Sequence, residues 1–138
     1  MKVHTTNYIN TFIEVAEDCP IHYGEIPPAK SDKRSLARMQ YDMLAGNDYV
    51  YTSDNVIFQV YAEKNDLTPG ELKAAREQFF SKGKPCLRSS PLTKRYGWGI
   101  HCNSKGKIAL VGSETKDYQE FKNDKSLQIV KAMRSKRK

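Results

Sequence analysis

The sequence contains no apolar stretch that approaches the about 18 consecutive residues of a transmembrane helix. Residues 1–14 carry polar side chains throughout and lack the apolar segment of a secretory signal peptide. Cysteine is scarce: Cys19, Cys86 and Cys102 form an odd set without a repeated spacing. In a chain without an export signal, such cysteines are expected to be reduced thiols. We therefore expect a cytoplasmic protein that does not enter a membrane.

Motifs for metal, cofactor and common catalytic chemistry are also missing. Cys19 and His22 have the spacing of a zinc ligand pair, but His101 and Cys102 are adjacent, and adjacent residues of a strand point to opposite faces. The glycine patterns of P-loops and dinucleotide-binding folds are absent, as are the motifs of serine hydrolases and zinc proteases. We expect no metal and no cofactor. Whether the protein is an enzyme is left open.

Charge is abundant and unevenly distributed. Charged residues make up 28% of the chain, and the net charge is +7. Residues 1–70 contain six Lys and Arg against ten Asp and Glu, whereas residues 71–138 contain seventeen against six. The excess of positive charge in the second half predicts a basic face and an anionic partner. The alternative is that this charge only keeps the protein soluble.

The first half of the chain predicts a strand followed by helices. Residues 11–15 are rich in β-branched and aromatic side chains, which favours a strand. A helix is expected from a cap at Ser31 or Asp32 to about Ala45, with Gly46 as its left-handed C-terminal residue. Its apolar stripe consists of Leu36, Met39, Met43 and Leu44.

Residues 56–62 are ambiguous, because their apolar side chains fit both the alternation of a strand and the spacing of a helix. We favour a helix, since Ser53 or Asp54 could cap it. A further helix is predicted over residues 69–80. Thr68 and Glu71 have the spacing of a capping box, Pro69 suits the first helical position, and the predicted buried stripe is Leu72, Ala75 and Phe79.

Residues 81–95 show no clear periodicity and are expected to be irregular. Residues 98–102 and 108–111 predict a hairpin whose turn contains Gly106. Ser113 is expected to begin a helix, Ser126 a short amphipathic segment, and a basic tail from about residue 131 is expected to fray.

Together these elements predict one α+β domain over residues 1–138. We expect a small, mostly antiparallel sheet of about three to five strands with helices packed on it.

The strongest candidate for a binding site is the basic segment between Lys82 and Arg95. It contains five basic residues, three hydroxyl residues besides Ser81, and no acid, which suits a phosphate or carboxylate. Tyr96 and Trp98 could stack on a base or a ring, or could instead anchor the segment to the core. The predicted anion-binding residues are Arg88, Ser89, Ser90, Thr93, Lys94, Arg95, Tyr96, Trp98 and His101.

Three functional hypotheses follow. The first is a non-enzymatic protein that binds nucleic acid or a phosphorylated small molecule through its basic second half. The second is a small enzyme with a pocket lined by residues 88–101, in which Arg88, Lys94 or Arg95 holds an anionic substrate. Nucleophilic catalysis by Cys86 or Cys102 with His101 as the base would belong to this hypothesis. The third is a structural or interaction protein, such as a dimer. A cleft with a shifted pKa at His101 or Cys86 would favour the enzyme, and exposed Tyr96 or Trp98 on a flat basic surface would favour the binding protein.

Three blocks carry a resemblance to known proteins: TNYINTFIEVAEDC at residues 6–19, AREQFF at 75–80 and SPLTKRYGWGIH at 90–101. They resemble a small bacterial family of uncharacterised proteins, a domain of unknown function, over nearly the whole chain. That family has no established activity, so the resemblance implies no catalytic role for any residue. The basic and aromatic residues near the late strand pair are similar to MmcQ/YjbR-type proteins, which implies an α+β fold with a frataxin-like layer.

Overall fold

A four-stranded sheet lies at the centre of the computed structural model, which describes residues 5–28, 35–83 and 86–134. The strand order is β3-β2-β1-β4, and two of the three pairings are antiparallel. β1 pairs antiparallel with β2 and parallel with β4, and β2 pairs antiparallel with β3. The strands are β1 (Thr11–Glu14), β2 (Trp98–Cys102), β3 (Ile108–Gly112) and β4 (Gln128–Lys131).

The strand directions determine which strand ends lie together. Since β1 and β3 are both antiparallel to β2, and β4 is parallel to β1, three of the four strands run in one direction. Their carboxyl ends therefore lie at the same end of the sheet. In open α/β sheets, ligands bind in the crevice outside such carboxyl ends.

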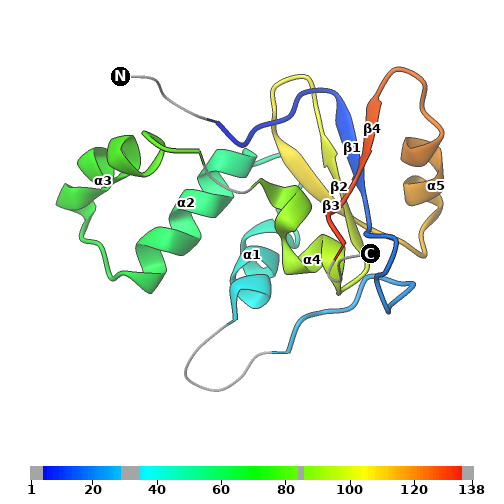
Figure 1. The fold of residues 1–138 in the computed structure, drawn as a ribbon, viewed down its shortest axis with the longest axis horizontal. Helices are drawn as coiled ribbons and strands as arrows, with labels where there is room; N and C mark the ends of the chain where they lie inside the picture. The colour runs from blue at the N-terminus through cyan, green and yellow to red at the C-terminus, as the bar shows by residue number, and fades with distance from the viewer. Residues whose placement is uncertain (1–4, 29–34, 84–85, 135–138) are drawn as a thin grey trace.

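Helices cover both faces of this sheet (Figure 1). α5 packs on one face, where Phe12, Val111 and Tyr118 form a buried cluster. α1 and α4 pack on the other face around the main core, which includes Ile13 and Ile100. The helices are α1 (Leu36–Leu44), α2 (Ser53–Lys64), α3 (Leu72–Phe79), α4 (Pro91–Lys94) and α5 (Lys116–Lys122).

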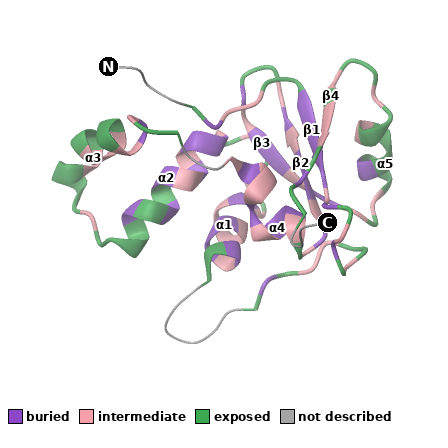
Figure 2. Cartoon of the chain, viewed as in Figure 1, coloured by how far each residue is buried: buried purple, intermediate pink, exposed green. Residues whose placement is uncertain are grey.

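α2 and α3 form an arm that extends away from the sheet (Figure 1). The far part of the arm has its own small core of Phe58, Ala62 and Phe80. Figure 2 shows that most of α3 is exposed or half-buried, whereas the central strands and the near end of α2 are largely buried. The arm is thus stabilised by far less apolar burial than the sheet and its covering helices.

The predicted α+β class is confirmed, and so are the elements with the clearest local signals. The strand predicted over residues 11–15 is β1, and the predicted hairpin is β2 and β3 with Gly106 at a φ of 76° in its turn. Residues 56–62 are helical, as favoured, within α2. Gly46 follows α1 with a φ of 76°, the left-handed geometry expected after a helix.

The N-terminal caps of the helices differ from those predicted. Ser35 caps α1, and the predicted caps Ser31 and Asp32 lie outside the described residues. Thr52 caps α2, while the Asp54 carboxylate instead accepts hydrogen bonds from the backbone N–H and the hydroxyl of Thr6. Thr115, not Ser113, caps α5. Each observed cap lies within four residues of the predicted one. Several hydroxyl and carboxylate residues precede each helix, so the sequence alone does not select one of them as the cap.

The stripes of α1 and α3 are also less buried than predicted. In α1, Met39 and Leu44 are buried, but Leu36 is 39% exposed and Met43 is half-buried. Residues 69–71 form a 3-10 turn before α3, and the predicted stripe of α3 is only half-buried. The Thr68 backbone N–H and hydroxyl both donate to the Glu71 carboxylate, as the capping-box spacing suggested for the N–H.

Two further predictions need correction. The segment 81–95 is not wholly irregular, because it contains a 3-10 helix at Leu87–Ser89 and α4. The segment after Ser126 includes β4, a strand that periodicity did not identify. Lys131 is the last residue of β4, and the Ala132 and Met133 N–H groups donate to the backbone, so the part of the predicted tail up to Arg134 is held in place. Residues 135–138 lie outside the described part.

None of the helices in the described part of the chain combines the length and apolar composition that a membrane crossing requires.

Candidate functional site

Arg88 joins the two basic runs of the second half of the sequence. Its Nε donates to the Lys131 carbonyl oxygen over 2.7 Å, and its own carbonyl oxygen accepts from the Met133 N–H over 2.8 Å. These bonds fasten the Leu87–Ser89 turn to the outer edge of β4. Arg88, Lys131 and Arg134 are thereby gathered at one edge of the sheet, although 43 residues separate the first two in sequence.

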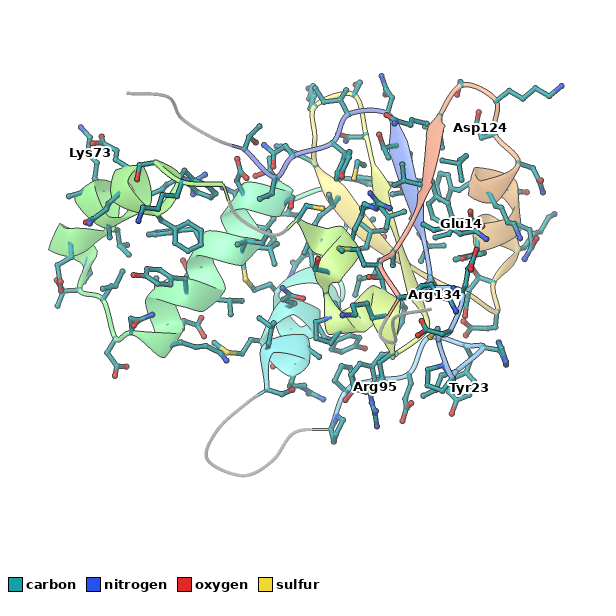
Figure 3. All side chains as sticks on the ribbon, viewed as in Figure 1. Glu14, Tyr23, Lys73, Arg95, Asp124 and Arg134 are labelled. Carbon is teal, nitrogen blue, oxygen red and sulfur yellow. The ribbon has the colours of Figure 1, made fainter. Side chains whose placement is uncertain are left out.

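α4 adds two more basic residues beside this edge. The Thr93 carbonyl oxygen accepts from the Ala16 N–H over 3.0 Å, and the neighbouring Glu17 carboxylate pairs with Lys131 and Arg134. α4 ends at Lys94 and Arg95, directly after Thr93. We call Arg88, Lys94, Arg95, Lys131 and Arg134 the basic edge. Figure 3 labels Arg95 and Arg134 in this region and Lys73 at the opposite end of the molecule.

Among the predicted site residues, the hydroxyls mostly serve the fold. Thr93 is fully buried, and its hydroxyl donates to the Leu87 and Ser90 carbonyl oxygens. Ser90 caps α4, accepts from the Leu92 N–H and donates to Gln40. Ser89 donates to the Met133 sulfur. Of these three, only Ser89 remains at the surface near the basic edge.

Tyr96 and Trp98 anchor a loop. The Trp98 indole N–H donates to the Glu25 carbonyl oxygen over 2.8 Å, and the Glu25 N–H donates to the Tyr96 carbonyl oxygen over 2.8 Å. Both rings are half-buried against the main core, and Gly24 lies so close to the indole that a Cβ there would be 2.8 Å from it. This arrangement matches the alternative in which these aromatics hold the segment to the core.

His101 lies on the other face of the sheet from the main core. Its ring stacks on Phe121 of α5 with the centroids 4.1 Å apart, and its Nδ1 is 2.7 Å from the Tyr49 hydroxyl. Ile100 and Cys102, its neighbours in β2, point into the main core. The structure therefore does not bring His101 together with the basic edge, which α4 and the Leu87–Ser89 turn form beside β4.

Burial lowers the pKa of His101 below the ordinary histidine value, and the Asp124 carboxylate opposes this shift more weakly. The folded protein therefore binds fewer protons than the unfolded chain just below the unfolded pKa of about 6.5. We expect the free energy of unfolding to decrease as the pH falls from 7 through this window. His101→Phe keeps the stacked ring but does not titrate. Urea unfolding at pH 5 to 8 should show a shallower decrease for the variant, and equal decreases would refute the assignment.

Cys86, a candidate nucleophile, does not lie where His101 could act as its base. Its sulfur lies 3.5 Å from the Tyr8 hydroxyl, and it lines a cavity of about 180 Å³ with mainly apolar walls. Cys86 raises the pKa of Tyr8 through this hydrogen bond, and burial adds to the increase, while the Arg88 guanidinium lowers it. Cys86 contacts the α1 side of the sheet, so His101 on the α5 side cannot act as its base.

The cavity beside Cys86 differs from the predicted enzyme pocket, which residues 88–101 are expected to line. Of residues 88–101, only Ser89 and Ser90 line this cavity.

All three cysteines are free thiols, and burial, with a smaller effect of Cys86, raises the pKa of Cys102 to about 12. Within residues 5–28, 35–83 and 86–134, no group of three or more His, Cys, Asp or Glu side chains could hold a metal ion.

The remaining positive charge of the second half does not gather at one place. Lys73 and Arg76 lie on α3 and Lys116 lies on α5, at opposite ends of the molecule (Figure 1), whereas Lys122 lies nearer the basic edge and lines a cavity together with Lys131. Within the described residues, the Arg88 hydrogen bonds to Lys131 and Met133 join two basic segments that lie far apart in sequence. The basic edge is therefore the candidate anion-binding surface.

The predicted site does not include Lys131 and Arg134, although the sequence predicts a basic tail from about residue 131. No local pattern reveals that the Leu87–Ser89 turn pairs with β4, because that contact joins segments far apart in sequence. The one available signal was compositional, namely two basic runs in a half of the chain with few acids.

Comparison with known proteins gives a family but no activity. A family model described as a family of unknown function, DUF6157, matches residues 3–138. No curated protein and no solved structure matches the chain.

Proposed function

The chain belongs to the family of unknown function DUF6157, and we propose that it binds nucleic acid through phosphate contacts made by the basic edge. The observation that supports this proposal is the meeting of the two basic runs, which Arg88 joins through its bonds to Lys131 and Met133. Lys and Arg side chains that follow one edge are the usual means of binding a phosphate backbone. The sequence continues after Arg134 with Lys136, Arg137 and Lys138.

Glu17 is the main competitor for these cations. Its carboxylate lies 3.2 Å from the Lys131 ammonium and 3.9 Å from the Arg134 guanidinium. The Glu17 and Lys131 side chains are 54% and 53% exposed, and exposed ion pairs contribute only about 0–1 kcal/mol. A phosphate could therefore replace Glu17 at little energetic cost.

The proposal rests on phosphate contacts alone, because Tyr96 and Trp98 are half-buried against the main core and the Trp98 indole N–H donates to the Glu25 carbonyl oxygen. Binding without base readout should be independent of sequence and strongly dependent on salt. A phosphorylated small molecule would instead need a pocket around the cations. Arg88, Lys94 and Arg95 do not line the neighbouring cavity of about 180 Å³.

The experiment is a fluorescence anisotropy titration of labelled single-stranded and duplex DNA and RNA at several salt concentrations. Four or five phosphate contacts should lower the affinity roughly 10²- to 10³-fold between about 50 and 200 mM salt. The double variant Lys94→Ala/Arg95→Ala should reduce the slope of log affinity against log salt by about two. Arg95 is exposed and Lys94 is half-buried at the end of α4, and neither belongs to the buried core, so the fold should be retained.

The matched control is Lys73→Ala/Lys116→Ala, which removes two exposed charges from α3 and α5 at opposite ends of the molecule. Its slope should equal that of the parent protein. Equal flattening by both double variants would assign the effect to overall charge and refute the basic edge. Absence of binding at about 50 mM salt would refute nucleic-acid binding altogether. Salt-insensitive capture of a phosphorylated small molecule would support the small-ligand hypothesis instead.

We also infer a cytoplasmic location and a bacterial origin for the protein. The three free thiols support the location, because thiols persist in the reducing cytoplasm. The bacterial origin and the likeness to MmcQ/YjbR-type proteins remain inferences from the resemblance of the sequence blocks.

A further inference from the structure

A polar cavity of about 290 Å³ lies where three strands end. Glu14 is the last residue of β1, Lys131 is the last residue of β4, and Ser113 directly follows β3. All three residues line the cavity, together with Tyr118 and Lys122 of α5. β1 and β4 pair in parallel with Glu14 opposite Lys131, so the side chains of both residues are held side by side.

Two hydroxyl groups in this cavity have unused hydrogen-bonding capacity. The Ser113 Oγ is buried and has no hydrogen-bond partner among the described residues. The Tyr118 hydroxyl oxygen accepts from the Val15 N–H over 3.0 Å, which leaves its proton for another acceptor. Burial is the main cause that raises the pKa of Tyr118, so the hydroxyl keeps this proton at neutral pH. An unpartnered buried polar atom is uncommon and indicates a missing partner.

The charges around the cavity are balanced. Glu14 is buried and lies 3.7 Å from the Lys122 ammonium, and Glu17 lies 3.2 Å from the Lys131 ammonium. An anion alone would be repelled by the buried Glu14 carboxylate, and a cation alone by the two ammonium groups. A ligand that carries one charge of each sign can satisfy both sides. The volume is just below the about 300–1,000 Å³ range of small-molecule sites.

We propose that this cavity binds a small zwitterionic metabolite of the α-amino-acid class. The ammonium group of the ligand lies against Glu14. Its carboxylate accepts hydrogen bonds from Ser113 and Tyr118 and faces Lys131. The site is separate from the Lys94 and Arg95 end of the basic edge, and the proposal does not depend on nucleic-acid binding.

The test is an NMR titration of the ¹⁵N-labelled full chain with each proteinogenic L-amino acid up to about 10 mM, a range that detects millimolar affinity. At least one amino acid should shift the amide signals of residues 14–19 and 113–118. Its decarboxylated amine and its deaminated carboxylic acid should bind at least about tenfold more weakly, since each lacks one charge. Ser113→Ala removes the unpartnered hydroxyl with almost no change in volume and should weaken binding by a similar factor.

Glu14→Gln should weaken binding further, and its matched control is Glu120→Gln. Glu120 is an exposed carboxylate on the same helix as Lys122 and does not line the cavity, so its variant should bind like the parent protein. If Glu14→Gln does not fold, Ser113→Ala alone decides the role of the cavity. Absence of these shifts with every amino acid, equal binding of the deaminated acid, or unchanged binding by Ser113→Ala would each overturn the proposal.

Discussion

Replacing Gly97 by Ala is expected to lower the free energy of unfolding by about 3 kcal/mol or more. Gly97 has a φ of 76°, and a Cβ built on it would overlap the Tyr23 carbonyl oxygen and lie 2.8 Å from the Tyr23 carbonyl carbon. Both contacts are with backbone, so neither a rotamer change nor a small side-chain shift relieves the clash. The φ alone costs a residue with a side chain about 1 kcal/mol.

The backbone around Gly97 cannot easily move away. The Ser113 N–H donates to the Gly97 carbonyl oxygen over 3.0 Å, and the Glu25 N–H donates to the Tyr96 carbonyl oxygen on the other side. Relief of the clash would therefore require breaking at least one of these bonds. Since Ser113 lines the polar cavity, Gly97→Ala should also weaken any ligand binding there.

Gly46→Ala is the matched control, because Gly46 has the same φ of 76° but would place its Cβ with no atom within 4 Å. Its replacement should cost only about 1 kcal/mol, the conformational part of the penalty. Urea unfolding of both variants against the parent measures the difference. Equal losses would show that the close approach of Tyr23 to Gly97 does not constrain the fold.

The elements that the sequence predicted well have signals confined to a few neighbouring residues. β1 follows from a β-branched and aromatic run, and the hairpin from two such runs around a turn with Gly106. Gly46 marks the end of α1 because a left-handed residue commonly follows a helix. In each case the same residues that form the element also carry the signal.

β4 shows why the remainder could not be predicted. It has four residues, none fully buried, and its partner β1 lies more than a hundred positions earlier in sequence. Such a short strand is stabilised by pairing with β1 rather than by local preference. The same holds for the Leu87–Ser89 turn, whose place is fixed by Arg88 and Met133 across the edge of the sheet.

The same limit applies to the grouping of the predicted site residues. Sequence proximity grouped His101 with the basic segment, but alternation along β2 places it on the α5 face, away from Ile100 and Cys102. The sequence pattern of β2 predicts this separation of His101 from Ile100 and Cys102, because adjacent residues of a strand point to opposite faces. The sequence also marks Glu14, because it is a carboxylate within an otherwise apolar strand. The positions of Ser113 and Lys122 near Glu14 are not marked in this way, because they depend on the path of the chain from β3 through α5 to β4.

Phe12→Ala is expected to cause the largest loss among core truncations on the α5 face, about 3–5 kcal/mol. Phe12 is fully buried in β1, with its ring edge-to-face against Tyr118 at 5.0 Å and stacked on Phe121 at 5.5 Å. Both partners belong to α5, so Phe12, together with the His101 ring on Phe121, holds this helix to the sheet. Its removal should loosen α5 and displace Tyr118 and Lys122 from the polar cavity.

Phe80→Ala is the matched control, since Phe80 is also nearly fully buried, at 3% exposure, but belongs to the separate core of the arm. Amide hydrogen exchange should show loss of protection in α5 for Phe12→Ala and in α3 for Phe80→Ala, because each truncation removes packing from its own cluster. Unchanged protection of α5 in Phe12→Ala would contradict the assigned role. Because α5 supplies one wall of the cavity, amino-acid binding should weaken in Phe12→Ala and persist in Phe80→Ala.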